Sequence, residues 1–130
     1  MMALLPHFGK QPVYKEHIMH KTNERDHSFR FDDHGPKYLM RTEEYDLGLV
    51  VLKPNQEFKK HHHAHASETF YTLSGEIHLY IDDDLQVLAQ GDILRCDPKE
   101  NHYVVNKGTE DWKAIFIKSP PINGDSVYPD

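Results

Sequence analysis

Four of the chain's eleven histidines lie within five positions, at His61, His62, His63 and His65. Neutral imidazole nitrogens are common ligands for divalent transition metals. In an extended strand, side chains two residues apart point to the same side. His61, His63 and His65 could therefore share one metal-binding face, and His62 would then lie on the opposite face.

Further ligands for such a metal must come from other parts of the chain, because one strand cannot surround an ion. Glu68 begins the next apolar segment, and His102 begins a later one directly after the loop at 97–101. Three imidazoles and one carboxylate, gathered where strands begin, would form a mixed nitrogen and oxygen site. The alternative is a solvated histidine-rich loop that takes up nickel or zinc adventitiously.

The elements that must position these residues are short β-like runs, which alternate with turn signals from residue 37 onward. They recur about every 8 to 12 residues without a helical pattern between them, which is typical of an antiparallel sandwich or barrel. Alternation supports strands, because Ile77, Leu79 and Ile81 share one face. The predicted runs are residues 46–52, 69–73, 76–81, 85–89, 93–96, 102–106 and 112–117.

The two ends of the chain differ from this β-rich centre. Residues 1–36 are polar, contain five histidines and show no sustained period, which predicts an N-terminal arm with little structure of its own and a strand near residues 27–31. The tail at 120–130 is rich in proline and predicts a coil along the outside. We therefore expect an arm (1–36), a β-barrel (37–119) and a C-terminal tail (120–130).

From Pro54 to Asn106 the sequence resembles the cupin superfamily of small double-stranded β-helix proteins, which carry two short motifs. The spacing of both motifs is kept, although Asn55 and Lys99 stand where the family usually has glycine. Asparagine tolerates the left-handed backbone that such a turn needs. The matching positions are Pro54, Asn55, His61, His63, Glu68 and Gly75 in the first motif, and Gly91, His102 and Asn106 in the second.

This resemblance implies an all-β fold, a jelly-roll barrel with a polar N-terminal arm. It also implies that His61, His63, Glu68 and His102 bind one divalent transition metal, which could be Fe, Mn, Ni, Co, Zn or Cu. His65 is an alternative ligand in place of His61, but pairing His63 with His65 leaves only two residues before Glu68, outside the family spacing.

The resemblance implies a site without choosing a reaction. The leading hypothesis is a metal-dependent enzyme of oxygenase or lyase type, dioxygenase-like, that acts on a small polar molecule. The alternatives are a non-catalytic binding or sensing module and a metal-independent sugar isomerase or epimerase whose histidines act as bases.

Residues that could contact a substrate are identified by strand parity and by charge. Phe70 and Thr72 share the face of Glu68, and Val104 and Asn106 share the face of His102. Lys37, Arg41 and Arg95 could pair with a substrate carboxylate.

Composition argues against several other classes of function. The net charge of -6, from 15 basic and 21 acidic residues, disfavours nucleic acid and anionic membranes as partners. The apolar run at the N-terminus is broken at Pro6, too early for a signal peptide. The single cysteine, Cys96, excludes an intramolecular disulfide. We expect a cytoplasmic protein.

We also expect a two-fold homodimer, because many cupins that resemble this chain pack sheet on sheet and exchange N-terminal segments. Its interface would use outward-facing strand residues and the arm at 1–36, which is long enough to reach a neighbouring subunit.

Overall fold

The fold consists almost entirely of β-strands, as the sequence pattern predicts. The computed structural model describes residues 3–5, 13–15 and 19–129. This part of the chain contains no α-helix, only one 3-10 turn at Glu24–Asp26, and no helix that could cross a membrane. The strands are β1 (Ala3–Leu5), β2 (Val13–Lys15), β3 (Gly35–Arg41), β4 (Asp46–Leu52), β5 (Glu57–His63), β6 (Ser67–Ser74), β7 (Ile77–Ile81), β8 (Asp84–Leu88), β9 (Ile93–Cys96), β10 (His102–Val105), β11 (Trp112–Ser119) and β12 (Ser126–Val127).

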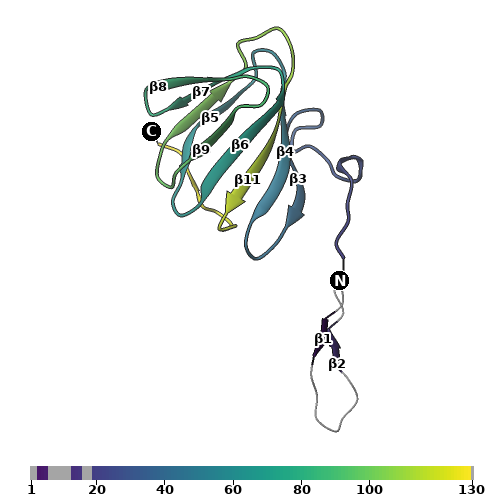
Figure 1. Cartoon of the computed structure of the whole chain (residues 1–130). Coiled ribbons are helices and arrows are strands. Elements are labelled where there is room, and N and C mark those ends of the chain that lie inside the picture. Colours follow the sequence, from purple (N-terminus) through teal and green to yellow (C-terminus); the bar gives the residue numbers. More distant parts are fainter. Residues whose placement is uncertain (1–2, 6–12, 16–18, 130) are drawn as a thin grey trace.

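Two five-stranded antiparallel sheets face each other and form the barrel (Figure 1). One sheet has the order β3-β4-β11-β6-β9, and the other has the order β12-β5-β10-β7-β8. The strands β4, β5, β6 and β7 alternate between the two sheets, as in a jelly roll. Several paired strands, such as β5 and β10 or β4 and β11, are therefore distant in sequence, and β5, β6 and β10 come together at one site. The small sheet β1-β2 lies apart from the barrel (Figure 1).

Apolar side chains from both sheets fill the interior of the barrel. Ile77 and Leu79 of β7 are completely buried, and so are Trp112 and Ala114 of β11, with the residues between them turned outward. This period of two is the pattern that predicts strands. Burial of these side chains supplies the main favourable free energy for closing the barrel.

Two buried polar side chains are satisfied inside this core. Thr72 Oγ1 accepts a hydrogen bond from Trp112 Nε1 at 3.0 Å. Asn106 Nδ2 donates to the carbonyl oxygens of Leu52 and Glu110 at 2.9 and 2.8 Å. Because a buried polar group without a partner is costly, both residues hold connections of the barrel in place.

Gly48 makes room for an aromatic pair that borders the site. It pairs with Phe116 between β4 and β11, and a Cβ at Gly48 would overlap the Phe116 ring and approach Lys37 O at 2.7 Å. The Tyr38 ring packs edge-on against Phe116, with centroids 5.3 Å apart at 80°. Glycine at this position therefore sets where Phe116 and Tyr38 lie.

The segment before the barrel differs from the expected strand near residues 27–31. It forms a tight turn instead, with an isolated bridge between Phe29 and Asp32. Asp32, at the end of this turn, has a positive φ of 69°, which an extended strand does not contain. Three stretches of the predicted arm, at residues 1–2, 6–12 and 16–18, lie outside the described residues.

The C-terminal tail also differs from the expected coil. Strand β12 adds to the edge of β5, with Ser126 opposite His63 and Val127 opposite His62. The tail therefore ends beside the histidine cluster.

Candidate metal centre

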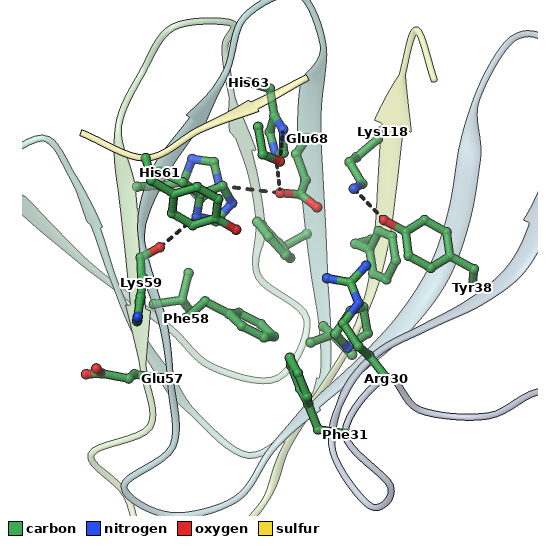
Figure 2. Close-up of a pocket in the computed structure, with 18 residues that line it drawn as sticks. Arg30, Phe31, Tyr38, Glu57, Phe58, Lys59, His61, His63, Glu68 and Lys118 are labelled. Atoms are coloured by element: carbon green, nitrogen blue, oxygen red, sulfur yellow. Dashed lines mark hydrogen bonds and ion pairs between the residues drawn. The ribbon is translucent and has the colours of Figure 1, made fainter. Parts of the chain in front are cut away.

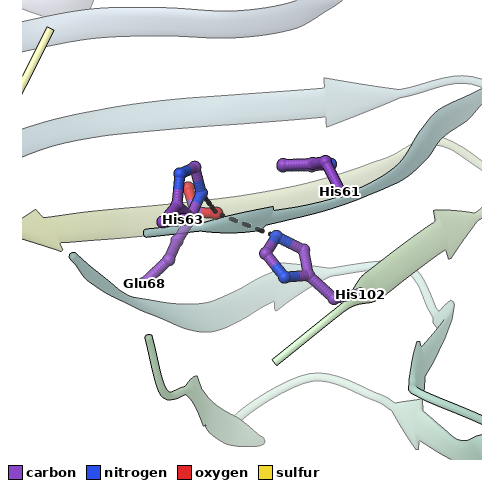
Figure 3. A group of neighbouring side chains, drawn as sticks. All are labelled: His61, His63, Glu68 and His102. Atoms are coloured by element: carbon purple, nitrogen blue, oxygen red, sulfur yellow. Dashed lines mark hydrogen bonds and ion pairs between the residues drawn. The ribbon is translucent and has the colours of Figure 1, made fainter. Parts of the chain in front are cut away.

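The four residues expected to bind a metal come together inside the barrel (Figure 3). His61 and His63 lie at the end of β5, Glu68 near the start of β6 and His102 at the start of β10. His61 and His102 are directly opposite each other in the β5–β10 ladder, so their side chains lie on the same face. One possible ligand atom from each of the four residues lies within 4.8 Å of all the others.

Glu68 lies at the centre of this group. Its Oε1 is 3.2 Å from His63 Nε2 and 3.4 Å from His102 Nε2. The His61 ring centroid is 4.3 Å from that of His102 and 5.2 Å from that of His63. Three nitrogens and one carboxylate oxygen therefore converge on one small volume.

The outer nitrogens of the imidazoles contact groups that orient the rings. His61 Nδ1 donates to Lys59 O at 2.7 Å, and His102 Nδ1 donates to Glu100 O at 3.3 Å. These bonds place the proton on Nδ1 and leave Nε2 of both rings as a lone-pair donor, as in metal-binding histidines. His102 Nε2 is buried and forms no hydrogen bond in the part of the chain described, although Glu68 Oε1 lies 3.4 Å away. An unpartnered buried nitrogen among three other donor atoms fits the role of a metal ligand.

The electrostatics favour the metal-binding forms of His61 and Glu68. Burial and the charge of His102 lower the pKa of His61 from 6.5 to about 4, so this imidazole is neutral at pH 7. Burial by itself raises the pKa of Glu68, but the contacts from His102 and His63 and the charge of Lys118 outweigh it and hold the pKa below its ordinary value. A neutral imidazole and an ionised carboxylate are the forms that coordinate metals.

His62 and His65 lie outside the cluster. His62 faces the other side of β5, where Nδ1 contacts Asn101 Oδ1 at 2.8 Å. Strand β5 ends at His63, so the alternation that placed His65 on the inner face stops before it. The exposed His65 ring instead contacts Asp125 Oδ1 at 2.8 Å.

A cavity of about 570 Å³ opens beside the cluster (Figure 2). Its size is that of a pocket for a small organic ligand. Of the four residues expected near a substrate, Phe70 and Val104 line it, and Thr72 and Asn106 do not. The latter two are occupied by the hydrogen bonds that hold the core and the loop before β11.

The basic residues that line the cavity are different from those suggested by the sequence. Lys37 Nζ donates to Glu24 O at 3.2 Å, Arg41 pairs with Asp46 at 3.2 Å, and Arg95 pairs with Asp97 at 3.4 Å; none of the three basic residues lines this cavity. Arg30, Lys59 and Lys118 line it instead.

The tail supplies two more lining residues that sequence reasoning missed. Ser126 Oγ is 3.4 Å from His63 Nδ1, and the Tyr128 ring lies 5.4 Å from the His61 ring. Asp125 fixes the tail here, because its carboxylate accepts hydrogen bonds from the backbone N–H groups of His65 and Ala66. No motif marks these contacts, since they depend on where the tail crosses β5.

Comparison with known proteins identifies the family. The profile of the cupin domain matches residues 48–118, which is more than half of the chain. The protein belongs to the cupin family. A search of curated proteins finds no match to this cupin.

Solved structures share its fold at low sequence identity. A double-stranded β-helix protein from Klebsiella pneumoniae has a TM-score of 0.72 and 21% identity, and the match covers 86% of this chain and 98% of that chain. The polyketide cyclase RemF from Streptomyces resistomycificus has a TM-score of 0.73 and 14% identity, covering 87% and 88%. A predicted oxalate decarboxylase from Thermotoga maritima has a TM-score of 0.61 and 18% identity, covering 67% and 93%. These likenesses concern the fold alone.

The donor set of this cupin fits a divalent transition metal. Imidazole suits Zn, Cu, Fe and Ni, and a carboxylate extends the range toward Mn, so the four ligands do not choose among these ions. Four protein ligands leave further positions open on a six-coordinate ion, next to the cavity.

Replacing any one of His61, His63, Glu68 and His102 with alanine should lower the metal affinity of this cupin at least about tenfold. His62→Ala and His65→Ala are matched controls from the same histidine run and should keep the affinity of the parent protein. Metal content by mass spectrometry and titration with Zn(II) measure both. Equal loss in His62→Ala, or no loss in His61→Ala, would contradict the assignment.

Zn(II) affinity should fall as the pH is lowered from about 6.5 toward 4, because protons compete for the imidazole nitrogens. Titration of bound Zn(II) against pH measures the effect. Affinity that stays constant down to about pH 4 would exclude imidazole ligation.

Proposed function

We propose that this cupin is a metal-dependent enzyme that acts on a small polar organic molecule, with chemistry of the oxygenase or lyase type. The observation that carries the proposal is the position of the cluster. His61, His63, Glu68 and His102 lie on the wall of a cavity of about 570 Å³, where a bound molecule could reach an ion that they hold.

The metal ligands and the aromatic residues of the cavity would have different roles. The three histidines and Glu68 would hold the ion, which when bound supplies Lewis-acid polarisation or activation of O₂. Phe58, Phe70 and Phe116 line the cavity and would exclude water from the reacting groups. The three imidazoles are neutral, so Glu68 would be the one charged ligand. A divalent ion held by this set would keep a net positive charge with which to polarise a substrate.

A non-catalytic binding module is the second candidate, and one observation favours it. Apart from the metal-binding set, Glu57 is the acidic residue in the described cavity lining, and its carboxylate accepts a hydrogen bond from Tyr103. This leaves no evident general base beside the cluster. A metal-independent isomerase would instead use the histidines themselves as bases.

Protein loaded in turn with Fe(II), Mn(II) and Zn(II) should convert a small polar substrate, with O₂ consumed if the chemistry is oxygenase-like. His63→Ala should lower turnover by at least about a hundredfold, and His62→Ala should match the parent protein. An oxygen electrode and product analysis by mass spectrometry measure these outcomes. Tight binding of a ligand recovered unchanged with every metal would favour the binding module, and full activity after chelation would favour the isomerase.

We further propose a two-fold homodimer that packs through the outer face of the sheet containing β6, β9 and β11. Ile93 is 67% exposed, Tyr71 40% and Ile117 39%, and Tyr71 lies directly opposite Ile93 in the ladder. Adjacent apolar side chains on an exposed sheet face are typical of a protein–protein contact.

Sedimentation at micromolar concentration should therefore give a dimer, and Ile93→Glu should shift the protein toward monomer because it would bury charge at the contact. Val87→Glu, on the other sheet, is the matched control at a similarly exposed apolar position. A parent protein that sediments as a monomer would refute the dimer.

A further inference from the structure

Two basic side chains lie at one end of the cavity and form no ion pair among the residues described. They are Arg30 and Lys118, which both line the cavity. Some cations of the barrel are paired, as Arg41 is with Asp46 and Lys53 with Asp33, whereas Lys59 lines the same cavity and, like Arg30 and Lys118, is in no ion pair among the described residues. Unpaired charges that face a cavity favour a ligand of opposite charge.

Tyr38 joins these two cations into one group (Figure 2). Lys118 Nζ donates to Tyr38 Oη at 2.5 Å, and Arg30 Cζ lies 5.9 Å from the centre of the Tyr38 ring. Because the Tyr38 hydroxyl accepts from Lys118, its own hydrogen stays available for donation. Ammonium, guanidinium and hydroxyl therefore offer donors at the same end of the cavity.

The backbone holds Arg30 at this position. Arg30 N donates to Pro36 O at 2.9 Å, and Phe31 N donates to His34 O at 3.2 Å. Gly35 has a φ of 87°, and a Cβ there would lie 2.6 Å from the Phe31 ring. The turn is thus closed by its own hydrogen bonds and presents Arg30 and Phe31 to the cavity.

This basic group is next to the metal centre. Lys118 of β11 is directly opposite Glu68 of β6, so the two side chains lie on the same face of the sheet. An anion held by Lys118 would therefore lie beside the ion that Glu68 helps to hold. A divalent ion would add to the positive charge that Arg30 and Lys118 already provide.

The rest of the wall is apolar and rich in aromatic rings. Phe58 and Val104 line the cavity from one sheet, and Phe70 and Phe116 line it from the other. Such a surface binds a planar or apolar body, whereas a highly hydroxylated sugar would leave many hydroxyl groups without partners.

We propose that this cavity binds a small organic acid, with its carboxylate held by Arg30, Lys118 and Tyr38 and its apolar body against the phenylalanine rings. This inference rests on the proposed function, because it names the substrate class of the same site. Its recognition residues, however, are distinct from the four metal ligands and can be tested separately.

Phenylacetate, phenylacetamide and acetate are suitable probes, because the amide has the shape of the acid without its charge and acetate lacks the ring. In calorimetric titrations of the Zn(II)-loaded full-length protein, phenylacetate should bind at least about tenfold more tightly than either of the other two. Arg30→Gln and Lys118→Met should each weaken phenylacetate binding about tenfold and leave phenylacetamide binding unchanged. Tyr38→Phe should weaken phenylacetate binding by a smaller factor.

Lys60→Met is the matched control, because Lys60 is an exposed lysine of β5 that does not line the cavity. Arg30 lies on an exposed turn, so Arg30→Gln tests the site without disturbing the core.

Zn(II) content is measured for every variant. If the parent protein holds no metal, the proposed function fails, and the same titrations on the metal-free protein still decide the inference. Equal affinity for acid and amide, no binding of phenylacetate at millimolar concentration, or unchanged phenylacetate binding in both Arg30→Gln and Lys118→Met would overturn it.

Discussion

The buried carboxylate of Glu68 is the constraint around which the interior of this cupin is arranged. A charge at 7% exposure is costly unless partners surround it, and here the partners come from three other strands. His63 is supplied by β5, His102 by β10 and Lys118 by β11. One acidic side chain therefore ties together both sheets of the barrel and places the metal centre beside the basic end of the cavity.

The segments outside the regular barrel complete the site. The turn at 29–36 brings Arg30 to the cavity, and the tail brings Ser126 and Tyr128 to the histidines. Both are held by local polar contacts, the turn by its backbone hydrogen bonds and the tail by Asp125. The barrel thus supplies the metal ligands and most of the cavity wall, and the segments around it add Arg30, Phe31, Ser126 and Tyr128.

Much of the barrel could be predicted because its strands follow the two-residue alternation that burial on one face requires. Ile77 and Leu79 are buried as expected, and the spacing of His61 and His63 correctly predicts that they point inward while His62 does not. Parity failed at His65 because the rule holds only while the strand continues, and β5 ends at His63. Thr72 and Asn106 were also expected to face a substrate from their strand alternation. Their side chains instead form hydrogen bonds within the protein, with Trp112 and with Leu52 O.

The sequence by itself determined the fold class, the family and the four residues that cluster, because all of these depend on local spacing and on the period of a strand. Only the tertiary structure decided which cations face the cavity. Arg41 and Arg95 pair with Asp46 and Asp97, whereas Arg30 and Lys118 line the cavity and are in no ion pair among the described residues. Lys118 lies opposite Glu68 because β11 pairs with β6 across about fifty residues of chain, a register that no local pattern contains. Whether a cation such as Lys118 faces the cavity therefore depends on long-range strand pairing, which exists only once the barrel has closed.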